Sequence, residues 1–317
     1  MENKILLTGA SGFIGSNVLL KIKHRKVNLL VRKNINADTT YLYFKKEINS
    51  TTTYTEALQN VNCIIHCAAR VHVMKDASVN PIEEYREVNT AGTLNLARQA
   101  VEAGVKRFIF ISSIKVNGEG TQIGSPFKAT DKPNPQDPYG QSKAEAEEQL
   151  LALAKETGLE VVIIRPTLVY GAGVKANFAS LMKLVAKGLP LPFGSITANR
   201  RSLVSVYNLV DLIVTCIDHP NAINQVFLVS DDHDLSTADM VRQMGVALSK
   251  PAKLIPLPVF CYSLVGSITG KQDVVSRLIG SLQVDITETK RRLDWMPPYK
   301  LEDGFKMTAN ALLREKK

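Results

Sequence analysis

A glycine-rich loop near the N-terminus limits most strongly what this chain can fold into. The segment Thr8-Gly-Ala-Ser-Gly-Phe-Ile-Gly15 follows an apolar run at residues 4–8 and opens an amphipathic stretch at residues 12–23. Glycines in such a strand–loop–helix unit turn the chain tightly, let the backbone approach a pyrophosphate and pack the helix against the sheet. Unpaired N–H groups and the dipole at the helix start favour a bound anion. The loop therefore predicts a dinucleotide site on a parallel sheet.

The same alternation continues beyond this loop. Apolar runs follow at residues 27–32, 63–66, 107–112 and 160–165, and helical stretches between them include 83–103 and 139–158. This pattern is typical of a parallel sheet that is covered on both faces. We predict an α/β fold, with a doubly wound (Rossmann) parallel sheet in residues 1–170 that a return segment at about 203–230 completes. Residues 171–202 and 231–317 are expected to form a smaller C-terminal substrate-binding lobe.

Composition excludes several other classes of protein. The formal charge is +9, but the basic residues are scattered, so an anionic small molecule fits better than nucleic acid. The four cysteines have no CxxC spacing, so neither a metal site nor a disulfide framework is expected. The longest apolar stretch, residues 254–268, contains two prolines and is too short to span a bilayer. The N-terminus lacks the features of a signal peptide, and we expect a cytoplasmic protein.

A Tyr-x-x-x-Lys pair at Tyr139 and Lys143 predicts the catalytic groups. A helix places residues four apart on one face, so the phenol and the ammonium can approach each other. Lowering the pKa of a tyrosine by about three units takes roughly 4 kcal/mol. A cation about 4 Å away in an effective dielectric of about 20 supplies a free energy of that order. Ser113 ends a buried strand, where ligands bind in open α/β sheets, and completes the predicted set.

Several motifs together resemble the extended branch of the short-chain dehydrogenase/reductase superfamily, the NAD(P)-dependent nucleotide-sugar epimerases and dehydratases. They are the Gly-x-x-Gly-x-x-Gly loop, His66-Cys-Ala-Ala69, Asn89-Thr-Ala-Gly-Thr-Leu-Asn95, Arg165-Pro166 and Val169-Tyr-Gly171. Val116-Asn-Gly118 resembles the family's Val-Tyr-Gly and assigns Ser113, not Ser112, to the catalytic serine, although Asn117 departs from the pattern. The resemblance implies the following cofactor contacts: Gly9, Ser11, Gly12, Phe13, Ile14, Gly15, Arg32, Ala68, Ala69, Arg70, Asn89, Ser112, Tyr139, Lys143, Arg165 and Pro166.

The end of the second strand bears on which nicotinamide is bound. Sites that select NAD usually carry an acidic residue there for the ribose 2′-hydroxyl, whereas this chain has Val31-Arg32-Lys33. Arginine pairs well with the 2′-phosphate of NADP because the contact is charge-assisted and often bidentate. NADP(H) is therefore favoured, with NAD(H) as the alternative.

The resemblance also implies substrate contacts and a reaction class. Arg201 and Arg277 match the two arginines that bind a nucleotide diphosphate, Asn177 matches an asparagine near the phosphate and sugar, and Ser113 meets the reacting sugar, so a UDP-sugar is the expected partner. Sugar 4,6-dehydratases place Asp-Glu after the catalytic Ser or Thr, but Ile114-Lys115 follows Ser113 here, which disfavours a dehydratase.

With a dehydratase disfavoured, the reaction class that remains is chemistry at C4 of the hexose. We expect mainly reduction of a UDP-4-keto-(N-acetyl)hexose, because Arg32 favours NADP; the alternative is a UDP-hexose or UDP-N-acetylhexosamine 4-epimerase. A reductase of small non-sugar carbonyl compounds is a further alternative, since it would not need Arg201 and Arg277. A cofactor-sensing scaffold without turnover is disfavoured by the complete Ser, Tyr and Lys set. A homodimer is expected by analogy with the family.

Overall fold

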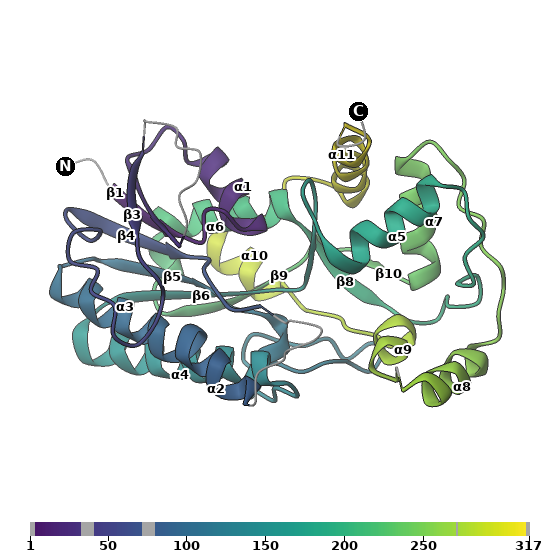
Figure 1. Cartoon of the computed structure of the whole chain (residues 1–317), viewed down its shortest axis with the longest axis horizontal. Helices are drawn as coiled ribbons and strands as arrows, with labels where there is room; N and C mark the ends of the chain where they lie inside the picture. The colour runs from purple at the N-terminus through teal and green to yellow at the C-terminus, as the bar shows by residue number, and fades with distance from the viewer. Residues whose placement is uncertain (1–3, 33–40, 72–79, 271, 315–317) are drawn as a thin grey trace.

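The computed structural model describes residues 4–32, 41–71, 80–270 and 272–314. Its largest feature is a seven-stranded sheet with the order β3-β2-β1-β4-β5-β6-β9, in which every neighbouring pair is parallel (Figure 1). The strands are β1 (Lys4–Thr8), β2 (Val27–Val31), β3 (Leu42–Lys45), β4 (Val61–His66), β5 (Arg107–Ile111), β6 (Glu160–Pro166) and β9 (Gln225–Val229). The predicted α/β doubly wound parallel sheet is confirmed, and β9 is the last strand of its order.

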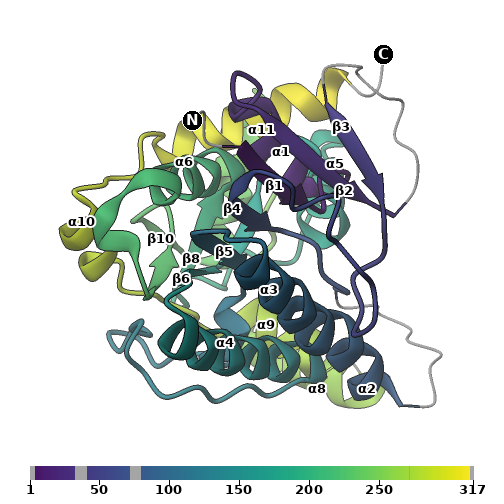
Figure 2. The ribbon, with the colours of Figure 1, turned by 90° about the vertical axis from the view of Figure 1, so that its left-hand side faces the viewer.

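The central strands are apolar throughout because helices cover both faces of the sheet. All five residues of β2 and of β5 are buried. Figure 2 shows α1 and α6 on one face and α3 and α4 on the other. These helices are α1 (Phe13–Lys21), α6 (Val206–Asp218), α3 (Gly92–Glu102) and α4 (Pro138–Thr157). Each face has its own cluster of buried side chains.

The helical stretch predicted at residues 83–103 contains a change of pitch. It consists of α2 (Pro81–Tyr85), the π-helical segment η1 (Arg86–Ala91) and α3. A π turn holds one residue more than an α turn, so it changes which side chains face a neighbouring helix, and such segments occur often at functional sites. Asn89 and Thr90 lie inside η1 and are buried against α4. A hydrophobic pattern does not reveal one extra residue in a turn, which is why the sequence predicted a plain helix.

The remaining residues build a second body beside the carboxyl ends of the strands. A three-stranded sheet in the order β10-β8-β7 lies there with a buried cluster that includes Tyr170, Phe178 and Phe305. Its elements are β7 (Leu168–Tyr170), β8 (Arg201–Ser205), β10 (Asp234–Leu235), α5 (Ala176–Ala186), α7 (Thr237–Ala247), α8 (Val259–Thr269), α9 (Gln272–Ile279) and α11 (Leu301–Arg314). Two short helical turns, η2 (Ile114–Val116) and η3 (Pro220–Ala222), and α10 (Thr287–Leu293) complete the fold.

The predicted boundary between sheet domain and lobe stays a prediction. Part of the C-terminal third packs into the core of the large sheet: Ile286, Leu293 and Trp295 belong to the same buried cluster as α1 and α6. Chain order alone therefore does not separate the two bodies. Within the described residues, no helix combines the length and the apolar character needed to cross a bilayer.

Candidate active site

The glycine loop fits the phosphate-binding role that the sequence predicts. Gly9 has φ 71°, and a Cβ there would lie 2.7 Å from the backbone N of Ala68. A Cβ on Gly15 would lie 2.2 Å from the carbonyl oxygen of Gly9, so this glycine lets α1 pack on the loop. Gly12 is the N-cap of α1 and provides no side-chain cap, and among the described residues beyond its chain neighbours a Cβ on it would lie near the oxygen of Gly9, at 3.2 Å. The start of α1 thus offers backbone N–H groups and open space to an anion.

The turn after β4 borders this loop and is held by a neutral histidine. The two ring nitrogens of His66 lie 2.8 Å from Thr8 Oγ1 and 3.0 Å from Thr93 Oγ1. Burial, reinforced by the charge of Lys143, lowers the pKa of His66 to about 3, so the ring is uncharged at neutral pH. The backbone N of Ala68 donates to Thr8 Oγ1 at 3.1 Å. These contacts fix residues 66–70 beside the glycine loop, where cofactor contacts are predicted for Ala68, Ala69 and Arg70.

Ser113, Tyr139 and Lys143 meet at the carboxyl end of β5. Ser113 lies two residues beyond the end of β5 and caps η2, since its Oγ accepts from Lys115 N at 3.2 Å. Tyr139 lies in the first turn of α4, and its hydroxyl is hydrogen-bonded to Ser113. Lys143 follows one turn later and is only 1% exposed. Its ammonium donates to Ile111 O at 2.9 Å, at the end of the strand that precedes Ser113.

The electrostatics of this group are set mainly by burial. Burial lowers the pKa of Lys143 to about 7, with Glu147 and Cys67 acting in the opposite direction. The pKa of Tyr139 is raised by burial and by the charge of Asp137, whereas the hydrogen bond from Ser113 lowers it. Desolvation of the Tyr139 hydroxyl therefore opposes formation of the phenolate, an effect that the Tyr-x-x-x-Lys spacing does not reveal. Lys143 is poised to change its charge near neutral pH.

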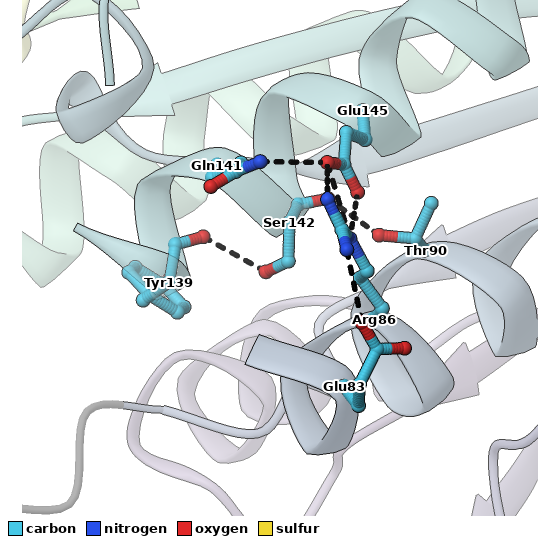
Figure 3. A network of polar contacts seen from close by, with 7 residues as sticks. All are labelled: Glu83, Arg86, Thr90, Tyr139, Gln141, Ser142 and Glu145. Atoms are coloured by element: carbon cyan, nitrogen blue, oxygen red, sulfur yellow. Dashed lines mark hydrogen bonds and ion pairs between the residues drawn. The ribbon is translucent and has the colours of Figure 1, made fainter. Parts of the chain in front are cut away.

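A network of polar contacts fixes the catalytic helix to α2 and η1 (Figure 3). Arg86 forms ion pairs with Glu145 at 2.7 Å and with Glu83 at 3.0 Å. Thr90 Oγ1 donates to the backbone oxygen of Ser142 at 2.8 Å, and Ser142 Oγ donates to that of Tyr139 at 2.8 Å. The π-helical segment therefore controls the placement of the first turn of α4.

Asn89 links the predicted cofactor loop to the same helix. Its Oδ1 accepts from the backbone N of Arg70 at 2.8 Å, and its Nδ2 donates to Arg70 O and to Ser142 Oγ, each at 3.0 Å. All its described polar contacts are internal, so the side chain holds residues 66–70 against α4. A direct cofactor contact of Asn89 stays a prediction.

The side chains of Ser112 and Arg165 both bind Glu147, a buried carboxylate on α4. The guanidinium of Arg165 binds Glu147 with Nε at 3.0 Å from Oε1, and both side chains are 4% exposed. Ser112 Oγ also donates to Glu147, and Asn117 Oδ1 accepts from Arg165 Nη1 at 2.9 Å. Asn117, which departs from the family's tyrosine, thus satisfies this arginine. The cofactor contacts predicted for Ser112, Arg165 and Pro166 stay predictions. The described polar contacts of the Ser112 and Arg165 side chains join elements of the protein itself.

The predicted diphosphate arginines lie close together in the second body. Arg201 on β8 donates from Nη1 to the backbone oxygens of Arg277 at 3.0 Å and Gly280 at 3.2 Å. Burial lowers the pKa of Arg201, and the charge of Arg277 lowers it further, against the opposing effect of Glu119. Two arginines on neighbouring segments suit one multivalent anion. Asn177 is exposed in the first turn of α5, and Arg32 is exposed at the end of β2, while the adjacent Lys33 lies outside the described residues.

Sequence reasoning missed three groups at this site: Lys115, Asp137 and Glu147. Asp137 is the N-cap of α4, with Oδ1 accepting from Gly140 N at 2.6 Å, and the sequence signal was an Asp directly before a proline at a helix start. Glu147 had no local signal, because its partners come from other segments: Ser112 lies just after β5, and Arg165 lies on β6.

Comparison with known proteins places these motifs in one family. The model of the NAD dependent epimerase/dehydratase family matches residues 5–230. The chain belongs to this family. The predicted resemblance is thereby confirmed, together with the interpretation as an enzyme of the short-chain dehydrogenase/reductase type.

Relatives cover nearly the whole chain. A UDP-glucose 4-epimerase of Vibrio cholerae is 59% identical over 317 residues, covering 99% of this chain and 97% of that protein. An N-acetyl-α-D-glucosaminyl-diphospho-ditrans,octacis-undecaprenol 4-epimerase of Escherichia coli O157:H7 is 29% identical, covering 97% and 95%. The UDP-N-acetylglucosamine 4-epimerase of Bacillus cereus has the same fold, with a TM-score of 0.80, 18% identity and coverage of 99% and 100%.

The expectation that reduction of a UDP-4-keto sugar is the main activity is wrong. The relative at 59% identity is a 4-epimerase, which supports the alternative interpretation. The error arose because Arg32 was taken to decide between reaction types. A single exposed arginine at a strand end bears on cofactor affinity, but it does not determine whether a hydride is returned to the substrate. The family is NAD dependent, and the preference for NADP(H) is a separate question.

Proposed function

We propose that this chain is a UDP-hexose 4-epimerase that acts on UDP-glucose or a closely related UDP-sugar. The observation that carries the proposal is the 59% identity to a UDP-glucose 4-epimerase across essentially the full length of both chains. The gathering of Ser113, Tyr139 and Lys143 at one strand end supports it. The lysine at position 115, in place of the acidic pair of dehydratases, is consistent with chemistry confined to C4.

Each proposed catalytic residue has one task. Tyr139 accepts the proton of the C4 hydroxyl as that carbon is oxidised, and it returns a proton when the carbonyl is reduced from the other face. Ser113 donates a hydrogen bond to the C4 oxygen and also supports the phenolate. Lys143, when protonated, stabilises the phenolate electrostatically. The nicotinamide, when bound, supplies the acceptor and later the donor of the hydride.

The remaining site residues hold the two nucleotides. The loop at Gly9, Gly12 and Gly15 binds the cofactor pyrophosphate through backbone N–H groups. Arg201 and Arg277 bind the substrate diphosphate, and Asn177 contacts its sugar side. Because the substrate is held through its diphosphate, the 4-keto sugar can turn and present its opposite face, which epimerisation requires. A preference for NADP(H) through Arg32, a homodimer and a cytoplasmic location stay predictions.

The test is an incubation of the purified protein with UDP-glucose and no added reductant. We expect UDP-galactose to form until both epimers reach equilibrium, which nuclear magnetic resonance of the sugar resolves. Parallel reactions contain UDP-N-acetylglucosamine, or a UDP-4-keto sugar with NADPH. Steady consumption of NADPH without any C4 epimer from either UDP-sugar would contradict the proposal, and the Tyr139→Phe variant is the control for contaminating activity.

A further inference from the structure

Lys115 and Asp137 lie between the two elements that carry the catalytic hydroxyls. Lys115 is in η2, two residues after Ser113, and Asp137 caps α4, two residues before Tyr139. Ser113 and Tyr139 therefore belong to separate segments whose spacing has to be fixed by contacts between η2 and the start of α4. The structure provides two such contacts, a close approach of backbone and an ion pair.

The close approach is at Gly140. A Cβ there would lie 2.8 Å from the backbone oxygen of Lys115 and 3.2 Å from Lys115 Cβ, so η2 rests directly on the first turn of α4. Asn134 N donates to Val116 O at 2.9 Å and adds a second backbone link between the two segments. Backbone packing of this kind leaves little freedom along the helix axis.

The ion pair connects the same two segments through their side chains. Lys115 Nζ donates to Asp137 Oδ2, while Asp137 Oδ1 accepts from Gly140 N at 2.6 Å. The side chains of Lys115 and Asp137 are 22% and 20% exposed, so solvent screens the pair only in part. Lys115 Nζ also donates to Glu119 Oε1 at 2.7 Å on its more exposed side. One carboxylate thus caps the catalytic helix with one oxygen and binds the serine turn with the other.

We propose that Lys115 is a positioning residue for the epimerisation: it fixes the register of Ser113 against Tyr139 and neutralises the capping carboxylate that faces the catalytic phenol. The inference rests on the proposed function for its kinetic readout. The capping carboxylate satisfies a backbone donor at the helix start, but its charge disfavours a phenolate. Pairing it with Lys115 retains the cap and removes most of that charge.

The groups around Tyr139 define the expected sign. Burial raises the pKa of the phenol most, Asp137 and the neighbouring Tyr85 on α2 raise it further, and the hydrogen bond from Ser113 lowers it. Lys143 lies one turn along α4, and the guanidinium of Arg70 lies 5.6 Å from the centroid of the Tyr85 ring. Removing the Lys115 charge leaves Asp137 uncompensated and should raise the pKa of Tyr139. Removing the Asp137 charge should lower it.

The experiment compares Lys115→Met, Asp137→Asn and the double variant in their pH profiles of kcat/KM. The activity of a phenolate base falls below its pKa, so we expect the acidic limb of Lys115→Met to move to higher pH by roughly half a unit, about a threefold loss of rate below the limb. Asp137→Asn keeps a capping oxygen and should move the limb to lower pH. The double variant should resemble Asp137→Asn, because Lys115 acts through that carboxylate.

Two controls separate positioning from general damage. Glu119→Gln removes the other partner of Lys115 and should leave the limb in place, and Lys115→Arg should retain most of the activity. A limb that stays fixed in Lys115→Met, or that moves equally with and without Asp137, would overturn the proposal. A uniform loss of kcat at every pH would assign Lys115 a purely structural role and would overturn it as well.

A readout without turnover distinguishes failure of this inference from failure of the proposed function. The onset of phenolate absorbance, taken as the difference from a Tyr139→Phe background, should begin earliest in Asp137→Asn, later in the wild type and latest in Lys115→Met. That order supports the inference even if the wild type forms no C4 epimer, and a different order contradicts it even if epimerisation is fast.

Discussion

The two halves of the site are held in different ways. The catalytic half lies at the large sheet and is called the sheet side, and the substrate-binding half lies in the second body and is called the lobe side. On the sheet side, the helix that carries Tyr139 and Lys143 is fixed by a buried ion pair and by side chains from η1. On the lobe side, Arg201 and Arg277 stand 76 positions apart, and the described contact between them is a single hydrogen bond to a backbone oxygen at 3.0 Å. The first arrangement fixes the catalytic helix through several side chains, whereas the second holds Arg201 through backbone oxygens and brings its charge near that of Arg277.

This difference separates two kinds of function. Proton transfer requires hydroxyl groups held within hydrogen-bond distance of the substrate. Rigid support of these groups therefore offsets the free-energy cost of burying the charged side chains that provide it. Binding a diphosphate requires positive charge more than exact geometry, because several oxygens can accept from one guanidinium. Changes on the sheet side should therefore affect kcat or folding, and changes on the lobe side should affect KM.

The largest effect is expected from Tyr139→Phe. Removing the proton acceptor should lower kcat by about 10³-fold while cofactor and UDP-sugar still bind, since general acid–base groups contribute about 10²–10⁴-fold. Steady-state epimerisation measures the loss of kcat, and calorimetry with UDP measures whether the nucleotide still binds. Tyr85→Phe is the matched control, because its ring lies 6.1 Å from that of Tyr139 without taking part in proton transfer. Near-normal turnover of Tyr139→Phe would remove this residue from the mechanism.

The next effect is on folding. Glu147→Ala leaves the guanidinium of Arg165 buried without its carboxylate, and breaking a buried pair in this way costs about 3–5 kcal/mol. Urea unfolding followed by circular dichroism should show this loss, with Glu145→Ala as the milder control, because the Glu145 side chain is 27% exposed. Equal stabilities of the two variants would show that the buried pair does not fix the catalytic helix.

Local motifs of the site could be predicted from the sequence, whereas contacts between distant elements could not, for a physical reason. The glycine loop, Ser113 and the Tyr139–Lys143 spacing are local motifs, since each function is carried by residues within one turn or one strand end. Glu147 and Lys115 have partners on other elements, so their roles appear only once the chain is folded. The reaction type was misjudged because the direction of net hydride transfer depends on the whole site and not on Arg32 alone.

The diphosphate arginines provide the test on the lobe side. Arg201→Ala and Arg277→Ala should each raise KM for a UDP-sugar by about 10-fold or more, since a hydrogen bond to a charged group is worth about 1.5–3 kcal/mol, and kcat should change less. Arg200→Ala is the control, because its Nη1 donates to backbone oxygens of its own loop at 2.8 Å. Unchanged KM in both variants would favour a small non-sugar carbonyl substrate over a nucleotide sugar.

The smallest effect is expected from Arg32→Ala, which separates cofactor choice from the rest of the sheet side. The arginine is exposed at the end of β2, so its contact with a 2′-phosphate would be partly screened by solvent. We expect binding of NADP(H) to weaken by about 10-fold and binding of NAD(H) to stay nearly constant, as for the loss of about one charge-assisted hydrogen bond. Fluorescence titration with both reduced cofactors measures the ratio. Equal weakening of the binding of both cofactors would show that Arg32 supports the fold of the loop. Tight binding of NAD(H) alone in the wild type would remove the preference for NADP(H). The glycine loop and the residues beside it would then be the determinants of cofactor binding.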